Sequence, residues 1–125
     1  MSPINVFLAD PDPVMRKTVS NILASLGCLV LLEAESVEGV RDRLQAFPEL
    51  NINLVLVAAN FTDRNKSGRE GKAIAEEIKM SGLRIPVVVM SGAPHLQDGP
   101  YLKLHRPFTN QELRALLVEA KILQN

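Results

Sequence analysis

The residues best suited to chemistry in this chain stand directly after apolar segments. Asp10 and Asp12 follow the first segment, Ser91 follows the fourth, and Arg106 follows the fifth. Carboxylates are oxygen ligands for hard cations, and hydroxyl and guanidinium groups donate hydrogen bonds to anionic oxygens. Ala58, which ends the third segment, offers no reactive oxygen. These polar groups could therefore bind a cation or an anion, but the side chain of Ala58 cannot take part in that chemistry.

The segments that would position these residues alternate between two hydrophobic periods. Short apolar runs typical of strands lie at residues 6–9, 29–32, 54–57, 86–90 and 101–104. Between and after them, apolar residues at steps of three and four predict helices over about 13–26, 37–47, 71–81 and from 110 onward. The strand runs are continuous, which predicts a parallel sheet buried on both faces. We therefore expect an α/β domain with its functional crevice at the carboxyl ends of the strands.

Local signals indicate where the predicted helices begin and end. Ser36 is placed to cap the second helix, and Pro48 is expected to end it. Gly82 marks the end of the third helix. Thr109 and Glu112 form the capping-box pattern that opens the last helix. These signals agree with the hydrophobic periods and support the alternation of strands and helices.

Three segments of this pattern resemble the receiver domain of bacterial response regulators, the CheY-like phosphorylated module of two-component signalling. They are residues 7–16 (FLADPDPVMR), 87–93 (VVVMSGA) and 101–109 (YLKLHRPFT), in the family's order and spacing. The resemblance covers nearly the whole chain, so residues 1–125 are expected to form a single domain. It implies a flavodoxin-like, doubly wound sheet of five parallel strands in the order 2-1-3-4-5.

The resemblance also implies a site. In receiver domains, adjacent acids after the first strand and an acceptor aspartate after the third hold Mg²⁺, while a hydroxyl and a lysine bind the phosphoryl oxygens. Asp10 aligns with the first acid and Ser91 with the hydroxyl residue. Pro11 falls on the second acid, Asp12 is displaced by one residue, and Ala58 replaces the phosphoacceptor. The alignment thus removes a metal ligand and the reactive carboxylate together.

Two further positions depart from the family pattern. Arg106 replaces the lysine, and Lys103 stands where the family has an aromatic switch residue, with Tyr101 two residues earlier. We therefore expect a degenerate pseudo-receiver that has no metal, no cofactor and no catalytic residue. In the absence of an acceptor carboxylate, Arg106 is expected to pair with Asp10 or to donate to Ser91.

The expected function is a phosphorylation-independent signalling module of the two-component or phosphorelay type that acts through protein–protein contact. Its partner would be another signalling protein, a kinase or an output protein, and a homodimer is possible. One alternative is a receiver phosphorylated at an unconventional residue, Asp12 or Asp63, although helix-start and turn roles suit these residues better. Another is a small α/β enzyme that uses Ser91, for which only His105 could serve as the base. We expect no enzyme activity.

The connection before the fifth strand is short. Only 14 residues separate Ser91 from Arg106, and they must include the fifth strand. The seven residues 94–100 cannot form a helix of about three turns. The fourth crossover helix is therefore expected to be lost or shortened to a single turn. In receiver domains that helix contributes to the dimer and output face, so this face should be remodelled.

Composition limits the remaining classes of function. The 14 basic and 14 acidic residues give no net charge, unlike the clearly basic domains that bind nucleic acid. No apolar run approaches the roughly 20 residues that span a bilayer. The single cysteine, Cys28, is expected in the core. We therefore expect a cytoplasmic protein that binds neither nucleic acid nor membrane.

Overall fold

A computed structural model describes residues 3–62, 64, 66–93 and 96–124. Within these residues, five parallel strands form one sheet in the order β2-β1-β3-β4-β5. The strands are β1 (Ile4–Ala9), β2 (Cys28–Ala34), β3 (Leu54–Ala58), β4 (Val87–Ser91) and β5 (Leu102–His105). The helical elements are α1 (Pro13–Ser25), α2 (Val37–Arg43), the 3₁₀ turn η1 (Leu44–Ala46), α3 (Phe47–Leu50), α4 (Arg69–Met80) and α5 (Asn110–Glu119). The strand order predicted from the sequence is confirmed.

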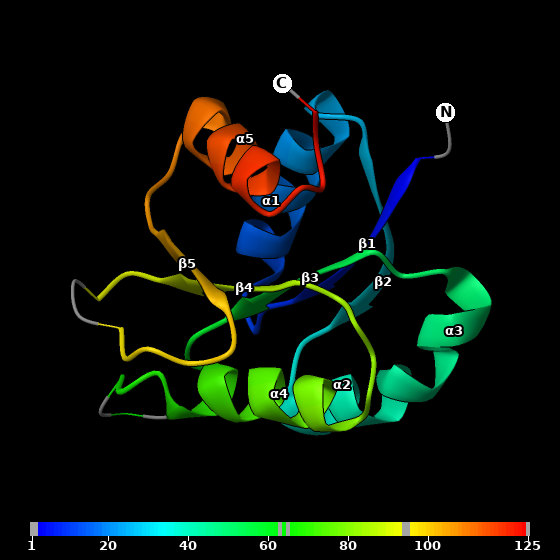
Figure 1. The fold of residues 1–125 in the computed structure, drawn as a ribbon. Helices are drawn as coiled ribbons and strands as arrows, with labels where there is room; N and C mark the ends of the chain where they lie inside the picture. Colours follow the sequence, from blue (N-terminus) through cyan, green and yellow to red (C-terminus); the bar gives the residue numbers. More distant parts are fainter. Residues whose placement is uncertain (1–2, 63, 65, 94–95, 125) are drawn as a thin grey trace.

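Helices cover both faces of the sheet (Figure 1). The helices α1 and α5 lie on one face, and α2 and α4 lie on the other. Along β1, Val6 and Leu8 pack with the α1 and α5 side chains, whereas Phe7 belongs to the core under α2 and α4. There the Phe7 ring meets the Phe47 ring edge-on, with centroids 5.0 Å apart. The central strands are therefore buried on both faces, as their continuous apolar runs predict.

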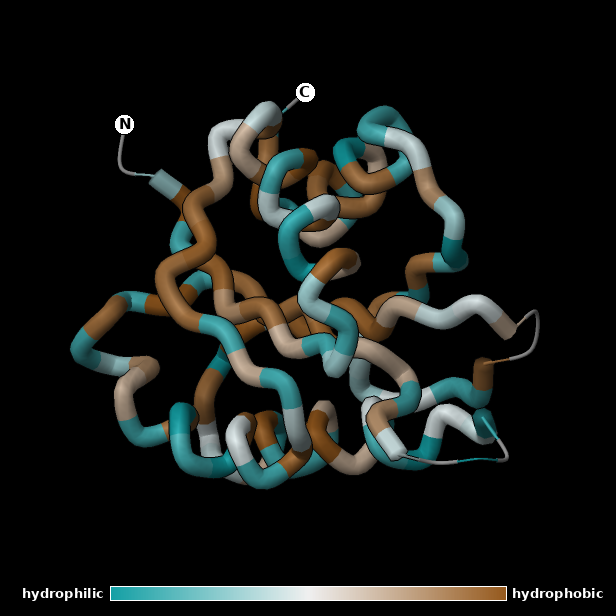
Figure 2. Tube along the Cα trace, turned by 180° about the vertical axis from the view of Figure 1, so that it is seen from behind, coloured by the Kyte–Doolittle hydropathy of each residue, from teal (hydrophilic) through white to brown (hydrophobic). Residues whose placement is uncertain are grey.

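Strand β2 departs from that prediction because it forms an edge of the sheet. Leu29 is 49% exposed and Leu31 is 40% exposed. Figure 2, the view from behind, brings this apolar strand to the front of the molecule. The expectation that every strand is buried on both faces is thus wrong for β2, and also for the other edge strand, β5, where Lys103 and His105 are exposed. An apolar run alone does not reveal whether helices reach over the edge of the sheet.

The second helical segment also differs from expectation, because Pro48 does not end it. The α-helix ends at Arg43, and a 3₁₀ turn leads into the short helix α3, which has Pro48 in its first turn. A proline is tolerated there because the first N–H groups of a helix need no partner within the helix. Ser36 caps α2 as predicted, since its hydroxyl accepts a hydrogen bond of 2.9 Å from the Gly39 N–H.

The crossover between β4 and β5 contains no helix in its described residues, 92–93 and 96–101. Its last part is held close to β5, because the Tyr101 hydroxyl donates to the Gln97 carbonyl and Lys103 pairs with Asp98. The predicted loss of the fourth crossover helix is confirmed for this part of the chain. Among the described residues, no helix beyond α4 covers that side of β5 (Figure 1).

Two expectations from composition concern the interior and the membrane. Cys28 is buried, and burial raises the pKa of its thiol, which suits a core residue better than a reactive one. In the described part of the chain, no helix has the length and apolar composition needed to cross a bilayer.

The close approach of α4 to β3 depends on Gly71. A Cβ atom added to Gly71 would lie 2.8 Å from the Ala58 carbonyl oxygen and 2.8 Å from the Ala59 Cα. Backbone atoms cannot turn aside, so Gly71→Ala should lower the free energy of unfolding by about 1–3 kcal/mol. This is the net change in unfolding free energy, because the steric cost should outweigh the gain of about 1 kcal/mol that alanine brings to a helix interior. Denaturant unfolding followed by circular dichroism measures the difference.

The matched control for Gly71→Ala is Gly39→Ala in α2. A Cβ atom at Gly39 would meet Arg43 Nη1 at 3.0 Å and the Ser36 hydroxyl at 3.1 Å, side-chain atoms that also hydrogen-bond the Gly39 backbone. These side-chain atoms can adjust, so the control should change stability far less than Gly71→Ala. If the two variants lose equal amounts of unfolding free energy, the close approach of α4 to β3 at Gly71 adds no cost of its own.

Candidate functional site

The carboxyl ends of four strands bring the site residues together at one edge of the sheet. Asp10 follows β1, Ala58 ends β3, Ser91 ends β4, and Arg106 follows β5. The register of the parallel strands places these ends at the same level. Ala58 of β3 lies beside Met90 of β4, and Ser91 of β4 lies beside His105 of β5. Residues far apart in the sequence therefore meet in one place, as the parallel-sheet prediction required.

The centre of this edge is an ion pair. A terminal guanidinium nitrogen of Arg106 (Nη2) donates a hydrogen bond to Asp10 Oδ2, and the same nitrogen lies 3.5 Å from the Met90 sulfur. The Asp10 side chain is 2% exposed and that of Arg106 is 20% exposed. The other carboxylate oxygen of Asp10 accepts a hydrogen bond of 2.9 Å from the Asp12 N–H. The predicted pairing of Arg106 with Asp10 is confirmed.

The alternative predicted partner of Arg106 was Ser91, and the contact between these two residues is confined to the backbone. The Arg106 N–H donates to the Ser91 carbonyl oxygen at 2.8 Å. Arg106 Nε is buried, and it has no hydrogen-bond partner among the described residues. The guanidinium is thus held by Asp10, while its backbone is held by β4.

The acidic turn after β1 is built around the start of α1. Asp12 is the N-cap of this helix, and its Oδ1 accepts a hydrogen bond of 2.9 Å from the Val14 N–H. Its carboxylate therefore stabilises the helix terminus, where negative charge is favoured. Pro11, between Asp10 and Asp12, is exposed and has no side-chain oxygen. The structure thus places Asp12 in the structural role expected from sequence.

Ala58 lies at the floor of a hollow of ≈ 450 Å³. Its side chain is buried, and the walls of the hollow include Asn60, Lys66, Ser91 and Arg106. Beyond the end of β3, Asn60 Oδ1 accepts a hydrogen bond of 2.8 Å from the Gly68 N–H. Two positive side chains therefore face a hollow whose floor carries no acid.

The residues at this edge do not fit the Mg²⁺ ion that the receiver resemblance implies. Asp10 is committed to Arg106, whereas Pro11 and Ala58 supply no side-chain oxygen. Mg²⁺ is bound through carboxylates and other oxygens in near-octahedral geometry. Among the described residues, no three His, Cys, Asp or Glu residues are grouped so that they could hold a metal ion together.

Ser91 is not arranged as an activated nucleophile. Its hydroxyl oxygen accepts a hydrogen bond of 3.1 Å from the Ala93 N–H. The register of β4 and β5 places His105 beside it, and both residues line a small hollow of ≈ 120 Å³. No hydrogen bond joins the two side chains in the described structure, although an activated serine needs a base within reach. This arrangement gives the enzyme alternative no support.

Lys103, which aligns with the aromatic switch position of receiver domains, forms an ion pair outside the site around Asp10. Its ammonium group pairs with Asp98 in the crossover, and this contact lowers the pKa of the Asp98 carboxyl, first through the hydrogen bond and then through charge. Sequence reasoning missed this pair because it depends on how the crossover turns back toward β5. The suggested alternative acceptor Asp63 lies outside the described residues.

Comparisons with known proteins give fold-level matches alone. No protein-family model matches the chain, and no curated protein matches it significantly. The signal receiver domain of an HD domain-containing protein from Pseudomonas fluorescens Pf-5 is 20% identical, with a TM-score of 0.75, and the match covers 96% of this chain and 95% of that one. The receiver domain of PhyR from Erythrobacter litoralis is also 20% identical, with a TM-score of 0.75, and the match covers 100% of this chain and 95% of that one.

A third match is a chain of the CheX–CheY–BeF₃–Mg²⁺ complex from Borrelia burgdorferi. It is 16% identical, with a TM-score of 0.79, and the match covers 97% of this chain and 91% of that one. Together with the strand order, these likenesses show that the chain has the CheY-like receiver-domain fold.

Proposed function

We propose that this chain is a two-component signalling module of receiver fold that works without phosphorylation, through contact with another protein. The observation that carries the proposal is the Arg106–Asp10 ion pair beside Ala58. In a phosphorylated receiver the corresponding groups must be free to meet a metal ion and a phosphoryl group. Here Asp10 and Arg106 pair with each other, and the acceptor position has no nucleophile.

The proposed mode of action follows from the permanence of this pair. A buried pair is broken only at considerable cost, because each charge would be left in a poorly solvated place. The carboxyl ends of β1 and β5 are therefore tied together in one arrangement, and no phosphoryl group is needed to select it. Any signal would come from the presence or absence of a partner, which we propose to be a kinase or an output protein.

The use of an unconventional acceptor has weaker support. The Asp12 carboxylate already binds the first turn of α1, and it has no neighbouring pair of free acids to hold a metal ion. Autophosphorylation of receivers with small phosphodonors needs such a metal site to offset the negative charge of the phosphoryl group.

The test is a titration of ¹⁵N-labelled protein with Mg²⁺ and beryllofluoride, a mimic of the phosphoryl group. We expect no saturable shift of the amide signals of Ala58, Ser91 and Arg106. A receiver domain that binds beryllofluoride, treated in parallel, shows that the reagent is active. Saturable shifts centred on these three residues would contradict the proposal.

A second measurement addresses the alternative acceptors. Incubation with acetyl phosphate and Mg²⁺, followed by intact-mass spectrometry, should detect no covalent phosphoryl group on this chain. A phosphoryl group mapped to Asp12 or Asp63 by peptide analysis would replace the present proposal with an unconventional receiver.

A further inference from the structure

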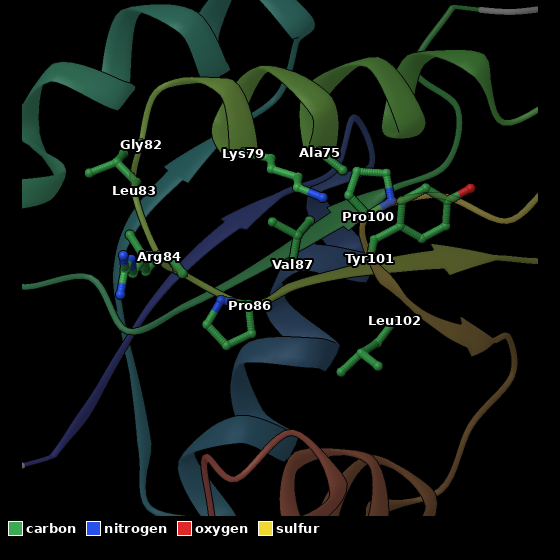
Figure 3. A pocket seen from close by; sticks show the side chains of 11 residues that line it. Ala75, Lys79, Gly82, Leu83, Arg84, Pro86, Val87, Pro100, Tyr101 and Leu102 are labelled. Carbon is green, nitrogen blue, oxygen red and sulfur yellow. The ribbon is translucent and has the colours of Figure 1, made fainter.

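A second hollow lies at the other end of the sheet from Asp10 and Ser91. It is a groove of ≈ 620 Å³ between α4 and the amino ends of β4 and β5 (Figure 3). Its size falls within the roughly 300–1,000 Å³ that is typical of binding pockets. Val87 and Leu102 come from the two strands, Ala75 comes from α4, and Pro86 and Pro100 come from the adjoining loops. The groove is therefore largely apolar.

In the described part of the chain, no helix packs beside α4 over β5. Leu102 and Leu104 of β5 pack into the core on the α1 and α5 side. Since side chains alternate along a strand, Lys103 and His105 face the side of α4, and both are exposed. On this face the described helices end with α4 (Figure 1), and the crossover residues Leu96 and Tyr101 pack against the core there, with Tyr101 also lining the groove.

The charged groups of the groove have one sign. Lys79 and Arg84 line it, both are exposed, and neither has an ion-pair partner among the described residues. No acidic residue lines this groove. In Figure 3 the Lys79 side chain reaches from α4 toward Pro100, while Arg84 lies at the end of the groove away from Tyr101. An apolar floor between two unpaired cations complements a ligand with apolar side chains and acidic flanks.

The groove extends along α4 toward an exposed apolar side chain. An adjoining hollow shares Lys79 and Pro100 with the groove and also contains Glu76 and Met80. Met80 is 86% exposed, the most exposed large apolar residue in the described part of the chain. A partner that lies along this direction would cover Met80 and would carry its acidic residues opposite Lys79 and Arg84, away from Glu76.

We propose that this groove docks an acidic amphipathic helix of a partner protein, which packs beside α4 at the amino ends of β4 and β5. A helix is the occupant that this geometry favours, because parallel sheets bury their faces under neighbouring helices that lie about 8–10 Å apart. Apolar residues of the helix pack over Val87, Ala75 and Tyr101, and acids on its flank pair with Lys79 and Arg84. The inference rests on the proposed function, a module that acts through protein contact, and names its surface and partner.

The test uses two designed peptides of about five helical turns. Both have the same stripe of leucines; one carries glutamate on its flanks, and the other carries lysine at the same positions. In titrations of ¹⁵N-labelled protein, the glutamate peptide should shift the amide signals of Ala75, Lys79, Leu83 and Val87. It should bind at least about tenfold more tightly than the lysine peptide, a difference of about 1.4 kcal/mol.

A charge swap in the protein makes the test specific. The double variant Lys79→Glu, Arg84→Glu changes exposed side chains and should keep the fold, which circular dichroism verifies. It should reverse the preference, so that the lysine peptide binds more tightly. The matched control, Lys17→Glu on α1 at the opposite face, should leave the preference for the glutamate peptide unchanged.

Three results would overturn the groove proposal: no binding of the glutamate peptide, an unchanged preference in the charge-swapped variant, or shifts confined to another surface. None of these results would bear on phosphorylation, which the beryllofluoride titration tests separately. Conversely, saturable beryllofluoride binding together with specific peptide docking would support the groove proposal and contradict the proposal of a phosphorylation-independent function.

Discussion

Replacing Arg106 with methionine should lower the free energy of unfolding by about 3–5 kcal/mol, the typical loss when one partner of a buried ion pair is removed. Asp10 is almost fully buried, and Arg106 is the cation that pairs with its carboxylate, whereas Arg16 Nη1 donates to its backbone carbonyl at 2.7 Å. Methionine keeps a similar length and apolar volume, so the loss reports the uncompensated charge rather than a large cavity. Equilibrium denaturation with urea measures it.

A double-mutant cycle separates the ion pair from other effects of the substitution. Asp10→Asn removes the charge but keeps an oxygen that can accept from the Asp12 N–H. The double variant Asp10→Asn, Arg106→Met should therefore be more stable than Arg106→Met alone, with a coupling energy of at least about 1 kcal/mol. A double variant as unstable as the sum of the two single changes would show that the pair contributes no coupling.

The Arg41–Glu77 pair provides the matched surface control. It joins α2 to α4 at 2.7 Å, and both side chains are largely accessible to solvent. Surface pairs contribute little because water and salt screen them. Arg41→Met should therefore destabilise the protein far less than Arg106→Met. Equal losses would indicate that the Asp10 site is screened as effectively as the surface.

The central part of the fold could be predicted because its signals are local. Residues 54–57 and 87–90 are unbroken apolar runs, and strands with this composition are buried on both faces of a parallel sheet. The Thr109–Glu112 capping box, present in the structure as predicted, is likewise encoded within four residues. Periodicity and capping therefore specify the alternation of strands and helices without knowledge of the tertiary structure.

The Arg106–Asp10 pair could also be predicted, although the two residues are far apart in the sequence. Parallel strands place their carboxyl ends at one edge, so residues that follow neighbouring strands must approach each other. The exposure of Leu29 and Leu31 could not be predicted in this way, because it depends on β2 being an edge strand beyond the cover of helices. The groove was missed for a similar reason, since its lining comes from α4, β4, β5 and the loops before these strands, which no local sequence pattern brings together.

The function of the site could be predicted only through the resemblance, and the fold-level matches leave it as a proposal. The geometry adds a physical reason for the proposed lack of phosphorylation. Three features carry it: the absent ligand at Pro11, the absent nucleophile at Ala58, and the commitment of Asp10 to Arg106. Reversing all three at once therefore tests whether the proposal rests on the right residues.

The triple variant Pro11→Asp, Ala58→Asp, Arg106→Lys should bind Mg²⁺ and beryllofluoride, in contrast to the natural chain. The new carboxylates would join Asp10 as oxygen ligands for the metal ion, and the hollow of ≈ 450 Å³ above Ala58 leaves room for the added side chain. Lysine is a compact point charge without the planar fork of arginine, so it can turn from Asp10 toward an anion beside Ser91. Saturable amide shifts at Ser91 and at position 58 would report binding, and acetyl phosphate should then add one phosphoryl group at position 58.

The single variant Ala58→Asp is the decisive control for this argument. It supplies a nucleophile, but Pro11 still offers no ligand and Arg106 still holds Asp10, so it should bind beryllofluoride far more weakly than the triple variant. Equal binding by the single variant would show that the acceptor alone was missing, and that the Arg106–Asp10 pair opens readily. A folded triple variant that fails to bind would instead assign the loss to the backbone around the hollow, where Asn60 accepts a hydrogen bond from the Gly68 N–H.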